Sequence, residues 1–289
     1  MLKPEIKVDA ATELYGIFGN PVRHSLSPFI HNTLFHELGL NAVYLAFQIE
    51  ENSLGLAFEA IRALGMRGVN ITIPFKEKAE NFVDEIPEDI DRGVGAINTV
   101  VNKKGRLFGF NTDGPGFMRA LKEELAFTPE GKRIFVLGAG GAARGAAFAL
   151  AHASAGEIFI HNRSQGRAEG LAEYLAEHFP ETEIRPISGF EELHGKKIDL
   201  VVNATSCGMK PDDPSPFDLK LLGRQACVYD LVYSPAETHL LKQAKDLGWA
   251  RANGLGMLAN QAALSFALWT GRSEGIREAM RETLKKCHL

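Results

Sequence analysis

The sequence predicts an α/β protein with two domains, each built around a mostly parallel sheet. Short β-rich runs alternate with helical patterns along the chain, which is the order of β-α-β units. The breaker cluster Thr128-Pro129-Glu130-Gly131 separates two such patterns. The chain has 289 residues, enough for two modest domains that each have their own apolar core.

The first pattern contains strands, two helices and a hairpin. Asn52 and Ser53 are cap candidates in front of the second helix. The hairpin turn is Asn102-Lys103-Lys104-Gly105, with glycine where a positive φ is needed. In chain order we expect a strand Tyr15–Gly19, a helix Pro28–Leu38, a strand Val43–Ile49, a helix Leu54–Leu64, and the strands Gly68–Ile73, Ala96–Val101 and Arg106–Phe110.

The second pattern follows a helix over Gly114–Leu125 and the breaker cluster, which we interpret as the linker between the domains. It begins with an apolar strand, a glycine-rich turn and an alanine-rich helix. We expect, in order, a strand Arg133–Leu137, a helix Ala142–Ala151, a strand Glu157–His161, a helix Arg167–His178, the strands Leu200–Asn203 and Cys227–Leu231, and the helices Met257–Leu268 and Ser273–Lys286.

The composition excludes several classes of protein. The net charge is −4 and the 32 lysines and arginines are scattered, which argues against nucleic acid or an anionic membrane as a partner. No apolar run has the length of a membrane span or a signal peptide. The three cysteines, Cys207, Cys227 and Cys287, are typical of reduced thiols rather than of a disulfide framework or a zinc site. We therefore expect a cytoplasmic protein without a metal.

The glycine-rich turn predicts a dinucleotide site. The run Val136-Leu137-Gly138-Ala139-Gly140-Gly141-Ala142-Ala143 places Gly-x-Gly-x-x-Ala between a strand and a helix. Gly138 permits the tight turn, Gly140 lets the backbone approach a pyrophosphate, and Ala143 lets the helix pack closely on the strand. The N–H groups at the start of the helix suit the phosphates.

The residues after the second strand of this pattern favour NADP(H) over NAD. An NAD site usually has Asp or Glu there, whereas this chain has His161-Asn162-Arg163-Ser164, with Arg167 one helical turn later. A 2′-phosphate carries about two negative charges at neutral pH, which suit the donor fork of arginine. An arginine on a surface is common, so the joint pattern rather than Arg167 alone supports NADP(H).

Several polar residues in the first pattern are candidates for a substrate site. Ser25 and Ser27 alternate in a short loop before a helix, where two hydroxyls suit a carboxylate. The alternative for Ser27 is a helix N-cap with Pro28 at the first helical position. Thr72 and Lys76 follow a strand, at the strand end where ligands bind in open α/β sheets.

Asn98 and Asp113 supply an amide and a carboxylate farther along the chain. Asp113 could instead be an ordinary turn or cap residue, and Lys76 a solvated lysine. If the chain reduces a ketone, a proton donor must lie beside the alkoxide that forms, and a lysine hydrogen-bonded to an aspartate is suited to this.

The motifs together resemble those of the shikimate dehydrogenase family. The resemblance rests on eight further features besides the glycine turn, and these follow one another in the family's order from about residue 15 to 265. They are Ser25-Leu-Ser27-Pro28, Asn70-Ile-Thr72-Ile-Pro-Phe-Lys76, Ala96-Ile-Asn98-Thr, Asn111-Thr-Asp113-Gly, Asn162-Arg163-Ser164, Asn203-Ala-Thr205-Ser206, Asp230-Leu-Val-Tyr233-Ser-Pro and Gly254-Leu-Gly-Met257-Leu-Ala-Asn-Gln261.

The resemblance implies NADPH-dependent reduction of 3-dehydroshikimate to shikimate, with roles for named residues. Lys76 and Asp113 would be the catalytic pair. Ser25, Ser27, Thr72, Asn98, Gln261 and Tyr233 would bind the substrate, together with the catalytic pair. The cofactor would contact Gly138, Ala139, Gly140, Gly141, Ala142, Asn162, Arg163, Ser164, Arg167, Thr205, Ser206, Leu231, Gly254 and Met257.

The resemblance also implies a domain organisation. The substrate and catalytic domain would span residues 1–112, the Rossmann-type NADP-binding domain 113–252, and the helices of 253–289 would return to the first domain. The active site would lie in the cleft between the domains. Ser164 stands where family members often have threonine, which keeps the hydroxyl, and Asn253 stands where aspartate is frequent.

Three other functions are compatible with parts of the pattern. A quinate or broad quinate/shikimate dehydrogenase would share the fold and often accept NAD. A regulatory NADPH-binding module without catalysis would lack Lys76 or Asp113, and both are present. A methylenetetrahydrofolate dehydrogenase would not explain the serine loop or Gln261. The oligomeric state, monomer or homodimer, is open at this point.

Overall fold

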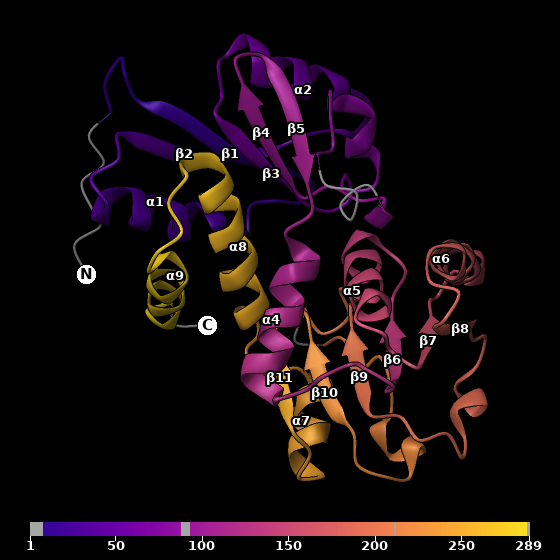
Figure 1. Ribbon diagram of the computed structural model, residues 1–289. Coiled ribbons are helices and arrows are strands. Elements are labelled where there is room, and N and C mark those ends of the chain that lie inside the picture. Colours follow the sequence, from indigo (N-terminus) through magenta and orange to yellow (C-terminus); the bar gives the residue numbers. More distant parts are fainter. Residues whose placement is uncertain (1–7, 88–92, 211, 288–289) are drawn as a thin grey trace. The chain divides into compact units, whose positions relative to one another are not determined.

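The computed structural model describes residues 8–87, 93–210 and 212–287, and these form two compact units (Figure 1). Unit 1 comprises the described residues up to Thr112 and those from Ala259 onward. Unit 2 runs from Asp113 to Leu258. The outer ends of the expected domains 1–112 and 253–289 lie outside the described residues.

Unit 1 is built on a five-stranded mixed sheet in the order β2-β1-β3-β4-β5. β1 pairs in parallel with β2 and β3, while β4 is antiparallel to both β3 and β5. A cluster of buried side chains that includes Phe18, Phe58 and Val100 forms the core between this sheet and α2. The bounds are β1 Glu13–Gly19, α1 Ser27–Glu37, β2 Ala42–Gln48, α2 Leu54–Ala63, β3 Gly68–Ile71, β4 Thr99–Lys103 and β5 Arg106–Phe110.

Most of the last two helices belongs to unit 1, because the described residues from Ala259 onward do. α8 is Leu255–Thr270 and α9 is Ile276–Lys285, and α9 packs against α1 (Figure 1). The indole N–H of Trp269 in α8 donates to the carbonyl of Val100 over 2.9 Å. Its ring lies 5.4 Å from that of Tyr15. The aromatic contacts bury large apolar rings and so hold α8 on the sheet.

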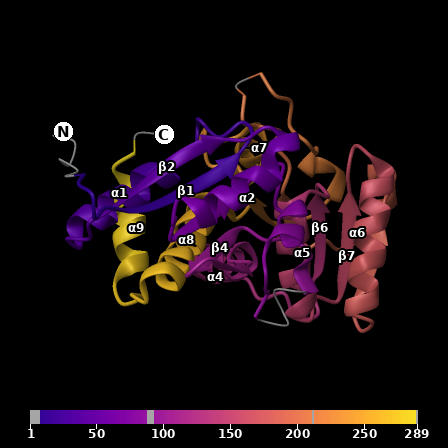
Figure 2. The ribbon, with the colours of Figure 1, turned by 90° about the horizontal axis from the view of Figure 1, so that it is seen from above.

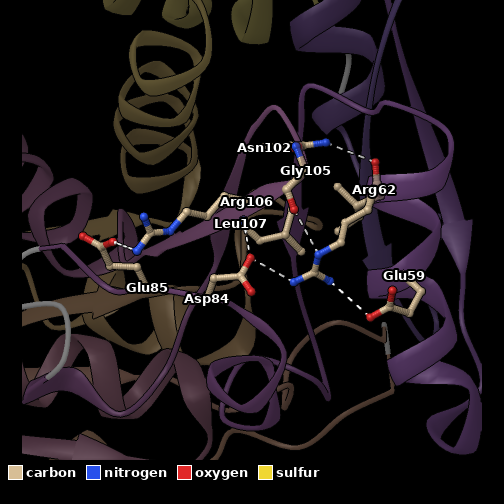
Figure 3. A network of polar contacts seen from close by, with 9 residues as sticks. Glu59, Arg62, Asp84, Glu85, Asn102, Gly105, Arg106 and Leu107 are labelled. Atoms are coloured by element: carbon tan, nitrogen blue, oxygen red, sulfur yellow. Dashed lines mark hydrogen bonds and ion pairs between the residues drawn. The ribbon is translucent and has the colours of Figure 1, made fainter.

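The hairpin of β4 and β5 is held at its tip by a polar network (Figure 3). Lys104 and Gly105 both have positive φ, as the expected turn requires. Arg62 of α2 donates from Nε to the carbonyl of Gly105 over 3.1 Å and from a terminal nitrogen to Asp84 over 3.0 Å. Asp84 also accepts from the backbone N–H of Leu107, and this bond, with the Arg62 guanidinium, lowers the pKa of Asp84. The network fixes the hairpin relative to α2.

Unit 2 is a six-stranded, fully parallel sheet in the order β11-β10-β9-β6-β7-β8. Its inner strands are mostly apolar and buried, as strands covered on both faces are. α5 and α6 contact each other and pack on β6 and β7 (Figure 2). The bounds are α4 Asp113–Leu125, β6 Arg133–Leu137, α5 Gly141–His152, β7 Glu157–His161, α6 Gln165–His178, β8 Glu183–Pro186, β9 Leu200–Asn203, β10 Cys227–Asp230, α7 His239–Asp246 and β11 Arg251–Asn253.

The structure differs from the sequence prediction at several points. The chain passes between the units at Thr112 and Asp113, not at the breaker cluster 128–131, because α4 packs on α5 and Phe117 of α4 contacts Tyr229. The strand expected over Ala96–Val101 begins only at Thr99. The sequence prediction also missed β8, β11 and α7.

Candidate active site

The glycine turn after β6 has the geometry that the sequence predicts. Gly138 has a φ of +112°, a conformation that L-residues with a side chain rarely adopt. A Cβ at this position would lie 3.0 Å from the carbonyl oxygen of Ala204. The N–H of Gly138 donates to the carbonyl of His161 over 2.7 Å, which ties the ends of β6 and β7 together. Only glycine fits this turn without strain.

The start of α5 provides backbone donors for an anion. α5 begins at Gly141, and Gly140 in front of it has no side chain that could cap the helix. The first N–H groups of an α-helix have no partner within the helix, and they lie at the positive end of its dipole. Ala139 is buried, while Gly140, Gly141 and Ala142 are partly exposed. This end of α5 therefore suits a phosphate group.

The loop after β7 presents two arginines. The side-chain amide of Asn162 donates to the carbonyl of Ser164 over 2.9 Å, and the N–H of Arg167 donates to the same carbonyl over 3.1 Å. These bonds close the loop at the start of α6. Arg163 and Arg167 are both exposed, and no carboxylate stands between His161 and Arg167 in the sequence. The loop thus offers positive charge and no acid to repel a phosphate.

A buried carboxylate that the sequence reading missed organises the loops after β9 and β10. Asp230 accepts from the amide of Asn203 over 2.9 Å and from the hydroxyl of Thr238 over 2.6 Å. It also accepts from the N–H of Val232 over 3.0 Å. Asn203 in turn accepts from the Thr205 hydroxyl over 2.7 Å. Burial raises the pKa of Asp230 to about 6, and these hydrogen bonds oppose the rise.

The Asp230 network holds the backbone beside three predicted cofactor residues. Thr205 bonds to it directly, Ser206 follows Thr205 in the chain, and Leu231 follows Asp230. Tyr233, a predicted substrate residue, also comes from this loop of unit 2 and is partly exposed. The quoted motifs Asn203-Ala-Thr205-Ser206 and Asp230-Leu-Val-Tyr233 contained the network residues, but nothing local indicated that they bond to each other.

Gly254 and Met257 occupy the turn into α8. A Cβ on Gly254 would lie 2.1 Å from the carbonyl oxygen of Leu231, so this close approach of two backbones requires glycine. The N–H of Met257 donates to the buried hydroxyl of Tyr229 over 3.2 Å. Gly254, Leu231 and Met257 therefore lie near one another at one end of the sheet of unit 2.

In unit 1, the serine loop leads directly into α1. Ser27 is the first residue of α1 and is only 5% exposed, and the residue in the N-cap position is Leu26. The alternative role of Ser27 as the N-cap is therefore wrong. Its N–H donates to the hydroxyl oxygen of Ser25 over 3.2 Å. Because that bond uses a lone pair of Ser25, the hydroxyl proton of Ser25 stays available for an acceptor.

Backbone hydrogen bonds bring the segments of Thr72, Lys76 and Asn98 together. The N–H of Ile97 donates to the carbonyl of Lys76 over 2.8 Å, and the N–H of Ile71 donates to the carbonyl of Asn98 over 2.9 Å. Lys76 is partly buried and lies in a turn, since a short 3₁₀ helix begins only at Lys78. Unit 1 thus gathers these three predicted substrate residues at one end of β3.

Asn98 has a fixed amide orientation. The N–H of Thr112 can only donate, and it lies 2.7 Å from Oδ1 of Asn98. Nδ2 of Asn98 donates to the hydroxyl of Thr112 over 2.9 Å. Gln261, the last predicted substrate residue, lies in α8 within unit 1 and is partly exposed. Asp113 is the first residue of α4 and is only 4% exposed, unlike an ordinary surface turn residue.

Comparisons with known proteins decide the family. The model "Shikimate dehydrogenase substrate binding domain" matches residues 17–100, "Shikimate / quinate 5-dehydrogenase" matches 121–209, and "Shikimate 5'-dehydrogenase C-terminal domain" matches 254–285. A protein of Methanopyrus kandleri named "Shikimate dehydrogenase (NADP(+))" is 45% identical over 97% of this chain and 99% of its own length. The chain belongs to the shikimate dehydrogenase family.

Solved structures of the family share the fold. Shikimate 5-dehydrogenase from Thermus thermophilus, in complex with NADP(H) and shikimate, is 39% identical with a TM-score of 0.80, over 94% of this chain and all of that one. Quinate dehydrogenase from Corynebacterium glutamicum, in complex with NAD, is 30% identical with a TM-score of 0.85, over 96% of this chain and 99% of that one. The α/β architecture and the resemblance found in the sequence are thereby confirmed.

None of the helices in the described part of the chain has both the length and the hydropathy needed to span a membrane. Within the same part of the chain, no group of three or more His, Cys, Asp or Glu side chains could hold a metal ion.

Proposed function

We propose that this chain is a shikimate dehydrogenase that catalyses the reversible reduction of 3-dehydroshikimate to shikimate with NADPH. The reaction is a step of chorismate and aromatic amino acid biosynthesis. The observation that carries the proposal is the 45% identity, over nearly the whole chain, to a relative named as an NADP(+)-dependent shikimate dehydrogenase. The exposed arginines after β7 independently favour a cofactor with a 2′-phosphate.

Unit 2 would hold NADP(H). The turn from Gly138 to Ala142 and the start of α5 would bind the pyrophosphate through backbone N–H groups. Asn162, Arg163, Ser164 and Arg167 would bind the 2′-phosphate, with the two guanidinium groups as charge-assisted donors. Thr205, Ser206, Leu231, Gly254 and Met257 would line the nicotinamide half. When bound, the cofactor supplies the hydride that reduces the ketone carbon.

The proton in the reaction is the task of Lys76 and Asp113. The C3 carbonyl of the substrate becomes an alkoxide when its carbon gains a hydride, so a proton must reach that oxygen. We propose that the Lys76 ammonium and the Asp113 carboxylate form the acid–base pair at this oxygen. In the reverse direction the same pair accepts the hydroxyl proton. Acid–base help of this kind typically accelerates a reaction by about 10²–10⁴-fold.

The remaining polar residues would bind the substrate. Ser25 and Ser27 would donate to the carboxylate, and the free proton on Ser25 supports this role. Thr72, Asn98 and Gln261 would bond to the ring hydroxyls and the carboxylate, and Tyr233 would contact the ring. Hydroxyl and amide groups can donate to a carboxylate and exchange hydrogen bonds with ring hydroxyls.

A matrix of substrates and nucleotides tests the proposal. Cofactor turnover at 340 nm would be measured for shikimate and for quinate, each with NADP and with NAD. We expect the kcat/KM of shikimate with NADP to exceed the other three by at least about tenfold, since a site built around particular polar groups rejects a mismatched ligand. Absence of turnover with shikimate would refute the proposal.

A quinate dehydrogenase is the second candidate, because the similar structure from Corynebacterium glutamicum has that name and was solved with NAD. Comparable turnover of quinate, or a preference for NAD, in the same matrix would favour it. The loop His161-Asn162-Arg163-Ser164 argues against NAD, since it lacks the acid that usually binds the ribose 2′-hydroxyl.

We also propose the cytoplasm as the compartment and a monomer or a homodimer as the state in solution. The cysteines support the assignment to the cytoplasm, because Cys207, Cys227 and Cys287 are widely spaced in the sequence and form no disulfide in the structure. Light scattering coupled to size-exclusion chromatography distinguishes 31.6 kDa from twice that mass.

A further inference from the structure

A buried network of hydroxyl and amide groups lies behind Asn98 in unit 1. We call it the Asn70 network, and its members are Tyr44, Asn70, Thr99, Thr112 and Ser265. Each of these residues is at most 5% exposed. They come from β2, β3, β4, the end of β5 and α8, so segments far apart in the sequence meet there. None of them was among the site residues predicted from the sequence.

Asn70 is the centre of the network, and its amide orientation is fixed. Nδ2 lies 3.1 Å from the carbonyl oxygen of Asn98, and a carbonyl can only accept. Nδ2 also lies within reach of Thr99 and Ser265, at 3.2 and 3.0 Å. Oδ1 must therefore face the Tyr44 hydroxyl, which donates to it over 2.7 Å. Tyr44 thus holds Asn70 in the orientation in which its amide supports the backbone of Asn98.

Thr99 connects this centre to the side chain of Asn98. Its hydroxyl lies 2.7 Å from that of Ser265, 3.2 Å from that of Thr112 and 3.3 Å from Oδ1 of Asn98. The hydroxyl of Ser265 donates to the carbonyl of Gln261 one turn earlier in α8. The network therefore touches both Asn98 and the backbone of Gln261, two of the residues proposed to bind the substrate.

We propose that the Asn70 network positions Asn98 and the Gln261 turn of α8 for the substrate, with Tyr44 and Thr99 as its positioning residues. The inference rests on the proposed function, because it names which side chains fix the proposed substrate site. A buried polar cluster in which the members bond to one another is rigid, since breaking any of its bonds leaves a polar group without water. That rigidity presents the Asn98 amide in one orientation before the substrate arrives.

Two tyrosines offer a matched test. Tyr44 and Tyr15 are paired residues on the neighbouring strands β2 and β1, and both are buried against Trp269. The Tyr15 hydroxyl instead bonds to Glu13, away from the network. Tyr44→Phe and Tyr15→Phe therefore remove the same atom from the same sheet. Only the first change releases Asn70. Because it also removes the hydrogen bond between Tyr44 and Ser27, the Thr99 variants test the network without that second effect.

Binding of shikimate by calorimetry and steady-state kinetics with NADP would be measured for both variants. We expect Tyr44→Phe to raise the Kd and KM for shikimate roughly tenfold, as loss of one well-placed hydrogen bond does, and to leave the KM for NADP within about twofold. Tyr15→Phe should change neither constant by more than about twofold. If the two variants had equal Kd and KM values for shikimate, the inference would be overturned. Loss of stability alone lowers the active fraction and would not change KM.

Thr99 allows a rescue experiment. Thr99→Val keeps the shape of the side chain and removes the hydroxyl, whereas Thr99→Ser keeps the hydroxyl. We expect a rise in the Kd for shikimate of roughly tenfold to a hundredfold for valine, and recovery to within about threefold for serine. Equal defects in the two variants would mean that packing, not hydrogen bonding, matters at Thr99, and would overturn its role. If the unmodified protein turned over no shikimate, the proposed function would fail first and this inference with it.

Discussion

Replacement of His31 by Phe should make the protein less sensitive to acid. His31 lies in α1 and is fully buried, and among the residues that the structure describes neither of its ring nitrogens has a hydrogen-bond partner. The imidazole stacks on Tyr44 at 4.5 Å between ring centres and lies among Phe266 and Trp269. Burial in these apolar surroundings lowers the pKa of His31 from 6.5 to about 3.

The depressed pKa gives the direction and size of the effect. Between pH 6.5 and about 3 the unfolded chain binds a proton at His31 that the native state does not bind, so the free energy of unfolding falls as the pH falls. At pH 5 the loss is about 2 kcal/mol relative to pH 8, a figure set by the unfolded pKa as long as the native pKa stays below 5. His31→Phe removes this contribution. Any overpacking cost of the larger ring would be the same at every pH.

Urea unfolding at pH 5, 6, 7 and 8, followed by tryptophan fluorescence and circular dichroism, measures the effect. The free energy of unfolding of the variant minus that of the unmodified protein should rise by about 2 kcal/mol from pH 8 to pH 5. His31→Leu should show the same rise, although its packing differs. A difference that stays constant with pH in both variants would refute the reasoning, because it would mean that native His31 accepts a proton as readily as the unfolded chain does.

Four further changes test the site and the fold. Lys76→Ala should lower kcat by roughly 10²–10⁴-fold with little change in KM, whereas Lys78→Ala, two residues away, should keep near-normal kcat. Arg163→Ala should raise the KM for NADPH by roughly ten- to a hundredfold and leave that for NADH nearly unchanged; equal losses would contradict the phosphate role. Asp230→Asn should gain about 2 kcal/mol in free energy of unfolding relative to the unmodified protein as the pH rises from 4 to 7. The native pKa of about 6 lies above the ordinary value of 3.8, so the unmodified protein loses stability as the pH rises through this interval and the carboxylate ionises. Gly254→Ala should destabilise unit 2 by roughly 2 kcal/mol or more in urea unfolding, since its Cβ would lie 2.1 Å from the Leu231 carbonyl; an unchanged midpoint would show that this backbone can move.

Local patterns in the sequence predicted the parts of the fold that depend on neighbouring residues. The strand, glycine turn and helix around Gly138 follow from residue types within about ten positions, and the hairpin turn at Gly105 follows from four. Strand β8 was missed because it is mostly polar, Glu183-Ile-Arg-Pro186, as an edge strand with limited burial can be. Helix α7 has a sequence signal that was overlooked, since Thr238 caps it by accepting from the N–H of Leu241.

The buried polar networks could not be predicted in the same way. The hydroxyl oxygens of Thr99 and Ser265 lie 2.7 Å apart, yet 166 positions separate the two residues in the sequence. Each alone resembles an ordinary strand or helix residue, because a hydroxyl can bond to the local backbone as well as to a distant partner. Asp230 is similar: its motif could be seen in the sequence, but its three neutral donors are visible only in the fold.

Both networks have the same relation to the proposed site. Asp230 bonds to the segments that carry Thr205 and Leu231, and Asn70 bonds to the segment that carries Asn98, so in each unit a buried carboxylate or amide fixes backbone that carries predicted site residues. A loop held only by apolar contacts could shift by rotamer changes, whereas a buried hydrogen-bonded loop shifts only if several polar groups lose their partners together. Each unit can therefore hold its own predicted site residues in place before any ligand binds. This arrangement lowers the ordering cost of binding, and the constants for shikimate and for NADP should consequently respond to separate sets of substitutions.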